Sequence, residues 1–357
     1  MKQLQPLSPR KISSLKRNLL SMFIFLLISG SFWLHDQLHT LPTQQIGQTA
    51  ELYSNQTNDD LTHLFSSAIN GAQKSVLLVV YSLTDPTIIR CLQNKSLQGI
   101  DVKVICDATA SPRLDTQLKS NSNHANPIHV TRRFGPGLMH QKILVIDEQL
   151  VWLGSANMTT ESLRLHGNLV AALDDSELAN MVKEKASTLH EEGKATSFPH
   201  KSLSIGGQQI EMWFLPDNRD AIPYLKSMIN SAQKTVKVAM FTFTRQDLAN
   251  AIIEAKNRGV KAEVVVDHHS AKGASAHVVK LLKDNGVDIS ISQGGPLFHH
   301  KFLYIDNQTL VNGSANWTKA AFSQNDDCFL VFHDLTHQQK VSMDTLWETI
   351  MADAIAP

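Results

Sequence analysis

A long internal repeat constrains the fold more than any other feature of this sequence. The stretch "GLMHQKILVIDEQLVWLGSANMT" at 137–159 is matched by "GPLFHHKFLYIDNQTLVNGSANWT" at 295–318, and His140 corresponds to His299, 159 residues later. Upstream, "INGAQKSVLLVVYSLT" from Ile69 matches "INSAQKTVKVAMFTFT" from Ile229. A period this long is outside the range of solenoid repeats. It predicts two similar domains in tandem, related by a pseudo-twofold axis.

Each copy alternates apolar, β-branched segments with segments of helical period. Alternation of this kind is typical of an α/β sandwich with a mixed sheet. A polar stretch rich in Gly, Ser and Lys at 191–208 predicts a linker between a first domain at 51–190 and a second at 209–357. The expected strands include 75–83, 101–106, 142–146 and 151–153, and the expected helices include 61–73, 86–98, 247–258 and 274–285.

The N-terminal 35 residues have the pattern of a targeting segment. Five basic residues and no acid precede or flank an uncharged apolar run of 16 residues, Leu19–Leu34. That run is shorter than the ~20 residues of a comfortable membrane span and longer than most signal-peptide cores. Residues 1–35 are therefore either an uncleaved signal-anchor or a cleaved signal peptide, followed by a polar stalk at 36–50. Both alternatives predict a membrane-anchored or secreted body on the non-cytoplasmic side.

The charge of the remaining chain argues against general attraction to polyanions. The whole sequence has 33 basic and 33 acidic residues, so the part after residue 35 has 28 basic and 33 acidic ones. A body with this balance lacks the basic footprint of a nucleic-acid-binding protein. The three cysteines, Cys91, Cys106 and Cys328, have no metal-type spacing and are expected to be buried free thiols.

The repeated His-x-Lys pair is the main candidate for chemistry. Residues two apart on a strand point to the same face, so His140 and Lys142 are expected to project together, as are His299 and Lys301. The Asp seven residues after each histidine has the opposite parity and falls at a hairpin turn, where Asp is favoured. We therefore interpret these two residues, Asp147 and Asp306, as structural.

Two such sets brought together would suit a phosphodiester. Lysines neutralise the non-bridging oxygens, one neutral imidazole attacks phosphorus, and a protonated imidazole donates to the leaving alcohol. The Gly-Ser-Ala-Asn run after each pair adds further donors, from Ser155 and Asn157 in one copy and Ser314 and Asn316 in the other. The lysines would repel a cation, so we expect neither a metal nor another cofactor.

The paired motif resembles that of the phospholipase D superfamily, whose HxKxxxxD and GSxN signatures appear twice. The resemblance covers about residues 50–335, and the second copy is most similar to mitochondrial cardiolipin hydrolases and bacterial endonucleases of that superfamily. It implies two α/β/α domains sharing one site, within a monomer, and a phosphohistidine intermediate formed without metal. It further implies catalysis by the two His-Lys pairs, and phosphate binding by Ser155, Asn157, Ser314 and Asn316.

The resemblance also implies an acidic residue after GSxN that orients a histidine of the other half. The second copy has Asn325-Asp326-Asp327 there, whereas the first has Asn168-Leu169-Val170 with no acid. Asp327 is therefore expected to support His140, making His140 the nucleophile and His299 the general acid. His299 would rely on Glu161, Asp174 or Asp175, or on no acid at all.

Three functions are consistent with these patterns. The first is a phospholipase D or a phosphatidyltransferase, with a phospholipid at a membrane as its partner. The second is a nuclease that uses the same chemistry, and the third is an inactive, membrane-tethered binding module. Intact motifs in both copies count against the third, and the apolar N-terminus and the acidic body favour lipid over nucleic acid.

Overall fold

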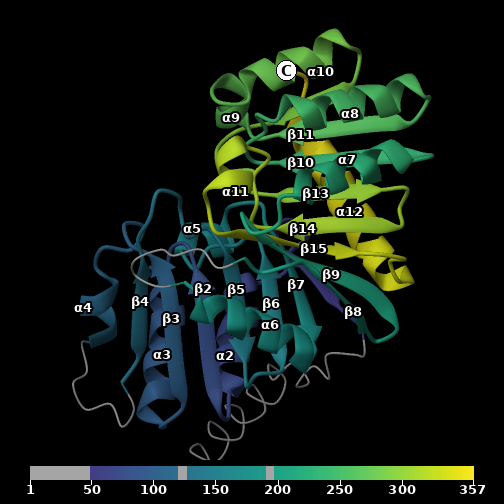
Figure 1. Ribbon diagram of the computed structural model, residues 1–357. Helices are drawn as coiled ribbons and strands as arrows, with labels where there is room; N and C mark the ends of the chain where they lie inside the picture. The colour runs from purple at the N-terminus through teal and green to yellow at the C-terminus, as the bar shows by residue number, and fades with distance from the viewer. Residues whose placement is uncertain (1–48, 120–126, 190–196) are drawn as a thin grey trace, which may run out of the picture. The chain divides into compact units, whose positions relative to one another are not determined.

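The computed structural model describes residues 49–119, 127–189 and 197–357, all within one compact unit (Figure 1). The predicted targeting segment at 1–35 and nearly all of the stalk at 36–50 lie outside the described residues. Among the residues that are described, no helix is both long and apolar enough to cross a bilayer.

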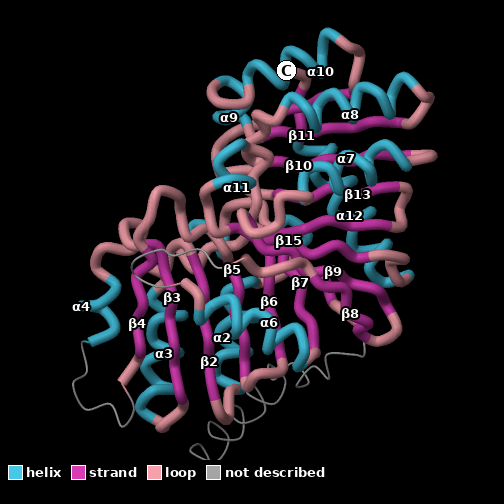
Figure 2. Tube along the Cα trace, in the orientation of Figure 1, coloured by secondary structure: helices cyan, strands magenta, loops and turns pink. Residues whose placement is uncertain are grey.

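The strands form two separate mixed sheets, one for each sequence repeat (Figure 2). The strands of the first sheet are β1 (Glu51–Ser54), β2 (Ser75–Val80), β3 (Asp101–Asp107), β4 (His129–Arg133), β5 (Lys142–Ile146), β6 (Leu150–Gly154) and β7 (Leu169–Asp174). Those of the second are β8 (Lys201–Ile205), β9 (Gln208–Leu215), β10 (Thr235–Met240), β11 (Lys261–Val266), β12 (Asp288–Ser292), β13 (Lys301–Ile305), β14 (Thr309–Gly313), β15 (Asp327–Phe332) and β16 (Ala354–Ile355).

The two sheets share one topology. The first has the order β1-β7-β6-β5-β2-β3-β4, and the second contains the matching order β9-β15-β14-β13-β10-β11-β12, with β8 and β16 added at its edges. In both sheets the three strands of the βαβ part run parallel, and the hairpin strands that follow are antiparallel. The structure thus has the mixed α/β, two-domain architecture that the repeat predicts.

The helices begin at residues suited to capping them. Asp60 and Asp85 accept backbone N–H groups at the starts of α2 (Leu61–Gly71) and α3 (Pro86–Leu97), and α3 also has proline at its first position. The remaining helices are η1 (Asn55–Thr57), α4 (Leu114–Lys119), α5 (Thr160–Arg164), α6 (Ser176–Ser187), α7 (Ala221–Ser231), α8 (Gln246–Asn257), α9 (His268–Lys272), α10 (Ala276–Asp284), α11 (Lys319–Ser323) and α12 (His337–Asp353).

Three hydrophobic clusters hold this architecture together. One packs α2 and α3 on one face of the first sheet, and another packs α7, α8 and α10 on one face of the second. The third contains residues of both sheets together with α6 and α12, for example Ile143 and Phe302. Because burial of apolar surface is the main favourable term in folding, this shared cluster joins the halves into one body.

The predicted linker differs from the structure at its C-terminal end. Residues 201–205 form β8, which pairs antiparallel with β9, instead of a connection without regular structure. The segment "KSLSI" buries Leu203 and Ile205 and exposes its other three residues. A strand at a sheet edge needs apolar residues on one face only. The alternation of apolar and polar residues in β8 is therefore short and is difficult to recognise within a polar segment.

Candidate active site

Both His-Lys pairs lie at the start of a central hairpin strand. Lys142 and Lys301 are the first residues of β5 and β13, and each histidine lies two residues before its lysine. All four side chains are buried, with the histidines 7% and 6% exposed and the lysines 3% each. Two isolated bridges between the halves, Met139 with Asp326 and Gly167 with Phe298, flank the histidines and bring the pairs into one site.

His140 is held by a carboxylate of the other half. Its Nδ1 lies 2.8 Å from Oδ1 of Asp327, the first residue of β15. Asp327 is fully buried, and Ser314 Oγ donates to the same carboxylate oxygen over 2.6 Å. The pKa of Asp327 is lowered, because His140 and the hydrogen bonds outweigh the effect of burial. The contact that the sequence led us to expect across the two halves is present.

His299 has a different partner. Its Nδ1 lies 3.1 Å from Oδ1 of Asn168, which directly precedes β7 in the first half. Asn168 lies 159 residues before Asp327, so the two residues occupy equivalent positions in the repeat. The sequence left open whether Glu161, Asp174, Asp175 or no acid supports His299, and the structure has the amide of Asn168 in that place. Asp175 caps α6, Asp174 accepts from Gln149, and Glu161 has no hydrogen bond to His299 among the described residues.

The surroundings of the two lysines lower their pKa values, and a bound anion would raise them again. Each ammonium donates to the carbonyl of its own pair's histidine and lies over an aromatic ring, Lys142 over Tyr81 and Lys301 over Phe241. Burial lowers the pKa of Lys142 to about 7, and burial together with Lys142 holds the pKa of Lys301 well below its usual value. A phosphodiester at this site would favour the charged forms again.

The imidazoles are also biased toward their neutral forms. Burial, followed by Lys142, holds the pKa of His140 below its usual value, although Asp327 acts in the opposite direction. Burial and the two lysines hold the pKa of His299 well below its usual value, and among the described residues no carboxylate is hydrogen-bonded to its ring. Neither Nε2 atom has a hydrogen-bond partner among the described residues, so both are free to face a substrate.

A family model described as "Cardiolipin synthase, PLD-like domain" matches the chain twice, over residues 65–189 and 225–347. The chain belongs to the phospholipase D superfamily. Its two matched segments correspond to the two sheets, and they contribute the two histidine-lysine pairs of one site. Sequence resemblance and geometry therefore lead to the same superfamily.

Individual relatives within the superfamily have different activities in their names. The mitochondrial cardiolipin hydrolase of Chlamydomonas reinhardtii is 30% identical over 122 residues, which are 34% of this chain and 54% of that protein. Cardiolipin synthase B of Salmonella typhimurium is 24% identical over 80% of this chain and 77% of its own length. The chain thus spans only about half the length of the hydrolase.

Among solved structures, phosphatidylserine synthase of Haemophilus influenzae has a similar fold. Its TM-score is 0.69 at 13% identity, over 86% of this chain and 87% of that one. This likeness shows that the phospholipase D fold extends over both halves. The fold alone does not distinguish hydrolysis from lipid synthesis or other phosphodiester chemistry.

The serines of the two phospholipase D motifs have a role that differs from the expected phosphate binding. Ser155 Oγ donates to Asn168, Ser314 Oγ donates to Asp327, and both serines are fully buried. Their hydroxyls therefore hold the residues that orient the histidines. The asparagines remain candidates for phosphate binding. Asn316 Oδ1 accepts the N–H of Thr242, and Asn157 Oδ1 is buried without a partner among the described residues.

The motif aspartates lie at the far end of the strands from the histidines. Asp147 and Asp306 occupy hairpin turns with φ of 54° and 52°. Asp147 accepts backbone N–H groups of residues 73–75, and Asp306 accepts those of residues 233–235. Burial opposes their ionisation, but these donors outweigh it and lower the pKa of both carboxyls. Each aspartate ties its hairpin to the start of the neighbouring strand.

Asp107 is the last residue of β3, and Asp267 directly follows β11. The two residues occupy equivalent positions near the site. Asp107 accepts the N–H of Met139, and Asp267 accepts the N–H of Phe298. Each therefore fixes the backbone one residue before a histidine.

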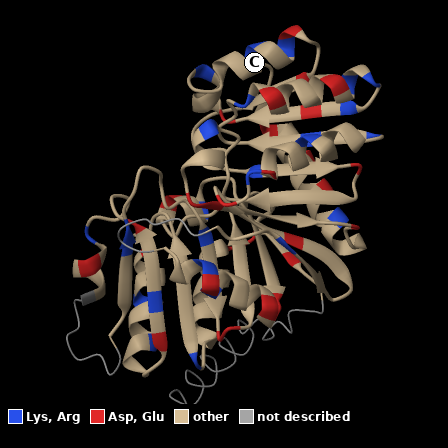
Figure 3. Ribbon diagram, in the orientation of Figure 1, with Lys and Arg blue, Asp and Glu red and all other residues tan. Residues whose placement is uncertain are grey.

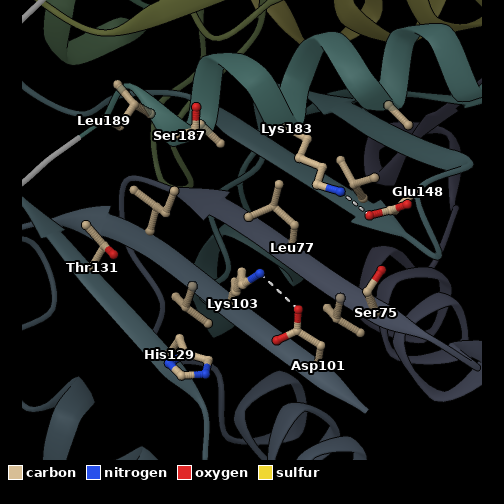
Figure 4. A pocket seen from close by; sticks show the side chains of 16 residues that line it. Ser75, Leu77, Asp101, Lys103, His129, Thr131, Glu148, Lys183, Ser187 and Leu189 are labelled. Atoms are coloured by element: carbon tan, nitrogen blue, oxygen red, sulfur yellow. Dashed lines mark hydrogen bonds and ion pairs between the residues drawn. The ribbon is translucent and has the colours of Figure 1, made fainter.

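A separate cavity of about 480 Å³ lies beside α6, at the end of the first sheet where β2 and β3 begin (Figure 4). Two lysines line it, and both pair with carboxylates, Lys103 with Asp101 and Lys183 with Glu148. Neither histidine pair lines this cavity. Within the described parts of the chain, no three His, Cys, Asp or Glu side chains gather in a group that could hold a metal ion.

Proposed function

We propose that the chain is a phospholipase D-type phosphodiesterase that cleaves phospholipid head groups through a phosphohistidine intermediate. The observation that carries this proposal is the pair of imidazoles, each bound through Nδ1 to the opposite half, beside two buried lysines. Such an arrangement provides a nucleophile, a proton donor and a binding site for phosphate oxygens.

The proposed reaction has two steps. Nε2 of one histidine attacks phosphorus, the bond from phosphorus to the head-group oxygen breaks, and the other histidine gives its proton to that oxygen. Water then attacks phosphorus, the second histidine takes a proton from the water, and the phosphorus–nitrogen bond breaks. An alcohol in place of water gives a phosphatidyltransferase of the cardiolipin synthase kind. The products, phosphatidic acid or a new diester, distinguish the two outcomes.

Exposed apolar side chains near the site support a lipid substrate. Phe134, Leu138 and Leu165 are 54%, 40% and 61% exposed. Phe134 follows Arg133, which pairs with Asp326, and the N–H of Leu138 donates to Asn325. Leu165 precedes His166, whose ring lies 6.3 Å from that of His299. Large apolar side chains left in water near a site often mark contact with a membrane or another partner.

Two of the three corresponding positions in the second half are polar, and the third, Leu297, is less exposed than Leu138. Phe134 and Leu165 correspond to Gln293 and Gln324, which are also exposed. Lysines and arginines are interspersed with acids along the described elements in the view of Figure 3, and the chain after residue 35 has more acidic than basic residues, unlike a protein with a basic footprint for nucleic acid. We therefore favour lipid over nucleic acid, and keep a metal-independent nuclease as the alternative.

The deciding experiment compares substrates side by side. The full-length protein is incubated with labelled phosphatidylcholine, cardiolipin and single-stranded DNA, with and without EDTA. We expect lipid cleavage that EDTA does not inhibit, loss of turnover in His140→Ala and His299→Ala, and normal turnover in His277→Ala, whose histidine is exposed on α10. Cleavage of DNA alone would support the nuclease. Inhibition by EDTA that added metal reverses would overturn the mechanism.

The apolar side chains can be tested separately. Phe134→Ser and Leu165→Ser should lower the rate on phospholipid vesicles and leave the rate on a soluble short-chain phospholipid unchanged. Leu97→Ser, which replaces an exposed leucine at the end of α3, is the matched control. Equal loss on both substrates would assign these residues to folding or to the site itself.

The location of the protein is also a proposal. We propose that residues 1–35 direct the body to the non-cytoplasmic side of a membrane, by the basic flank and the uncharged segment after it. Reporter fusions after Asp36 should be active outside the cytoplasm. Activity confined to the cytoplasm would contradict this orientation.

A further inference from the structure

Asn168 and Asp327 occupy equivalent positions but have different chemistry. Each directly precedes or begins the strand after the GSxN segment, accepts a serine hydroxyl of its own half, and contacts Nδ1 of the histidine in the other half. One is a neutral amide and the other a carboxylate. The two histidines of an otherwise symmetric site therefore have unequal partners.

The surroundings of Asn168 are complementary to an amide. Its Nδ2 donates to the backbone carbonyls of Ser162 and His166, over 2.8 and 3.0 Å. Carbonyl oxygens only accept hydrogen bonds, so they fix which end of the amide faces them. Oδ1 is thereby directed to Ser155 and His299. A carboxylate here would place an oxygen against both carbonyls.

The surroundings of Asp327 are of the opposite kind. Ser314 Oγ donates to its Oδ1, and Asn325 Nδ2 lies 3.4 Å from its Oδ2. Donors therefore face both carboxylate oxygens. The difference between the two positions extends to their neighbours and is built into the local structure of each half.

The amide of Asn168 also determines which nitrogen of the His299 ring carries a hydrogen. Because Oδ1 of Asn168 can only accept, Nδ1 of His299 must carry a hydrogen, which leaves the lone pair on Nε2 when the ring is neutral. The titratable groups near this ring include the basic Lys301, Lys142, His140 and His166, and the carboxylate of Asp267, which accepts the N–H of the preceding residue, Phe298. The partner hydrogen-bonded to Nδ1 is nevertheless a neutral amide, which stabilises a cation on His299 less than a carboxylate would.

We propose that Asn168 is a positioning residue that keeps His299 neutral and protonated at Nδ1, so that the first proton taken up by the histidine pair goes to His140, against Asp327. This order of protonation follows from the contacts of the two rings with Asn168 and Asp327. Its meaning for catalysis rests on the proposed phosphodiesterase function.

For the reaction, the consequence is a relocation of that proton. Attack by His140 requires its Nε2 lone pair, so the first proton taken up by the pair must pass to His299, from which it is given to the leaving oxygen. A bound phosphodiester anion between the rings raises the proton affinity of both. Because the histidines titrate as a coupled pair, the alkaline limb of activity reports loss of their shared proton and not of either ring alone.

The test is nitrogen NMR of the full-length protein labelled with ¹⁵N-histidine, in detergent and without substrate. His299→Gln and His140→Gln assign the two signals. We expect His299 to remain neutral and protonated at Nδ1 while His140 takes up the first proton as the pH is lowered. First protonation at His299, or a neutral ring protonated at Nε2, would overturn the proposal.

Substitutions at the two orienting positions complete the test. Asn168→Ala should release His299 into a mixture of both neutral tautomers, whereas an unchanged tautomer would contradict the role of Asn168. Asp327→Asn should bring the pKa of His140 down toward that of His299. Asn168→Asp, if it folds against the two carbonyls, should raise the pKa of His299 by about one unit or more. No rise in folded Asn168→Asp would count against the proposal.

These measurements require no turnover, so their failure is distinct from failure of the proposed function. An inactive protein with the expected proton distribution would refute the phosphodiesterase and leave the inference intact. An active phosphodiesterase in which His299 holds the first proton would refute the inference alone. In an active protein, folded Asn168→Asp should also move the alkaline limb of kcat/KM to higher pH.

Discussion

Arg133 and Asp326 form a buried ion pair between the two halves of the chain, with Nε 3.0 Å from Oδ2 and both side chains nearly inaccessible to water. Arg133 ends β4, and Asp326 directly precedes Asp327. The backbone of Asp326 also accepts the N–H of His140 and donates to the carbonyl of Leu138. The pair therefore fixes the segment from which the orienting carboxylate projects.

Arg133→Met should destabilise the protein by about 3–5 kcal/mol, because it leaves a buried carboxylate without its partner. Burial already raises the pKa of Asp326, and the arginine opposes that rise. In the variant the folded pKa lies further above the unfolded one, so the destabilisation grows as pH rises through the carboxyl range. Urea unfolding at several pH values measures this effect. The double variant Arg133→Met/Asp326→Leu should recover part of the loss, and an equal loss in both would contradict the explanation.

Asp327→Asn should slow formation of the covalent intermediate by roughly ten- to a hundredfold, the effect of losing one charge-assisted hydrogen bond. The carboxylate raises the pKa of His140 against the effects of burial and Lys142. Its removal should therefore also move the alkaline limb of kcat/KM to lower pH. Asp284→Asn, in an exposed pair with Lys280, is the control. A loss of rate without a change in the pH profile would indicate a purely structural role.

Rapid acid quenching should trap the phosphoryl group on His140. A phosphorylated imidazole that keeps its Nδ1 hydrogen is cationic, and Asp327 stabilises that cation better than Asn168 stabilises the one on His299. Peptide mapping of the quenched protein identifies the modified residue. Phosphoryl on His299 would reverse the assignment of nucleophile and acid.

Binding of an anion should draw protons into the site. At pH 8 a lysine with a pKa of about 7, as for Lys142, is mostly neutral, and the pKa of Lys301 is also held well below its usual value. A bound anion raises both pKa values, so protons are taken up from the buffer. Titration calorimetry with sulfate in two buffers of different ionisation enthalpy measures the number of protons. Lys142→Met should reduce the uptake, and an enthalpy that is independent of the buffer would refute the prediction.

Asp147→Ala and Asp306→Ala should each lower the free energy of unfolding by about 1–3 kcal/mol, because backbone N–H groups that are exposed or part-buried lose their charged acceptor. The pKa of each carboxyl is lowered in the folded state. The stabilisation is therefore present above the unfolded pKa and is lost as pH falls through the folded one. Thermal unfolding of variant and wild type should converge in acid. A large loss of activity in protein that remains folded would assign these residues to the site.

The repeat was sufficient to predict most of the fold. Matched apolar runs identified strands such as β2 and β10, and the helices lie within a few residues of their expected bounds. The buried state of the three free cysteines was also predicted correctly. Short edge elements such as β8 and β16 were missed, because strands with one covered face need few apolar residues.

The sequence predicted the residue types of the site more accurately than the hydrogen bonds among them. Matching Asn325 to Asn168 by type placed Val170 opposite Asp327, although Val170 is a core residue of β7. Keeping the 159-residue offset would have identified Asn168. The internal role of the serines had no such signal, since a hydroxyl near a phosphate site and one that holds an orienting side chain look alike in a sequence.

Each half orients the histidine of the other half with a different side chain, and this arrangement has an evolutionary consequence. In a site assembled from two identical chains, any substitution beside one histidine appears beside the other as well. Once both halves are encoded in a single chain, the two positions mutate independently. The carboxylate at 327 and the amide at 168 are a difference that only such a fused arrangement can inherit, and selection can then adjust each histidine separately.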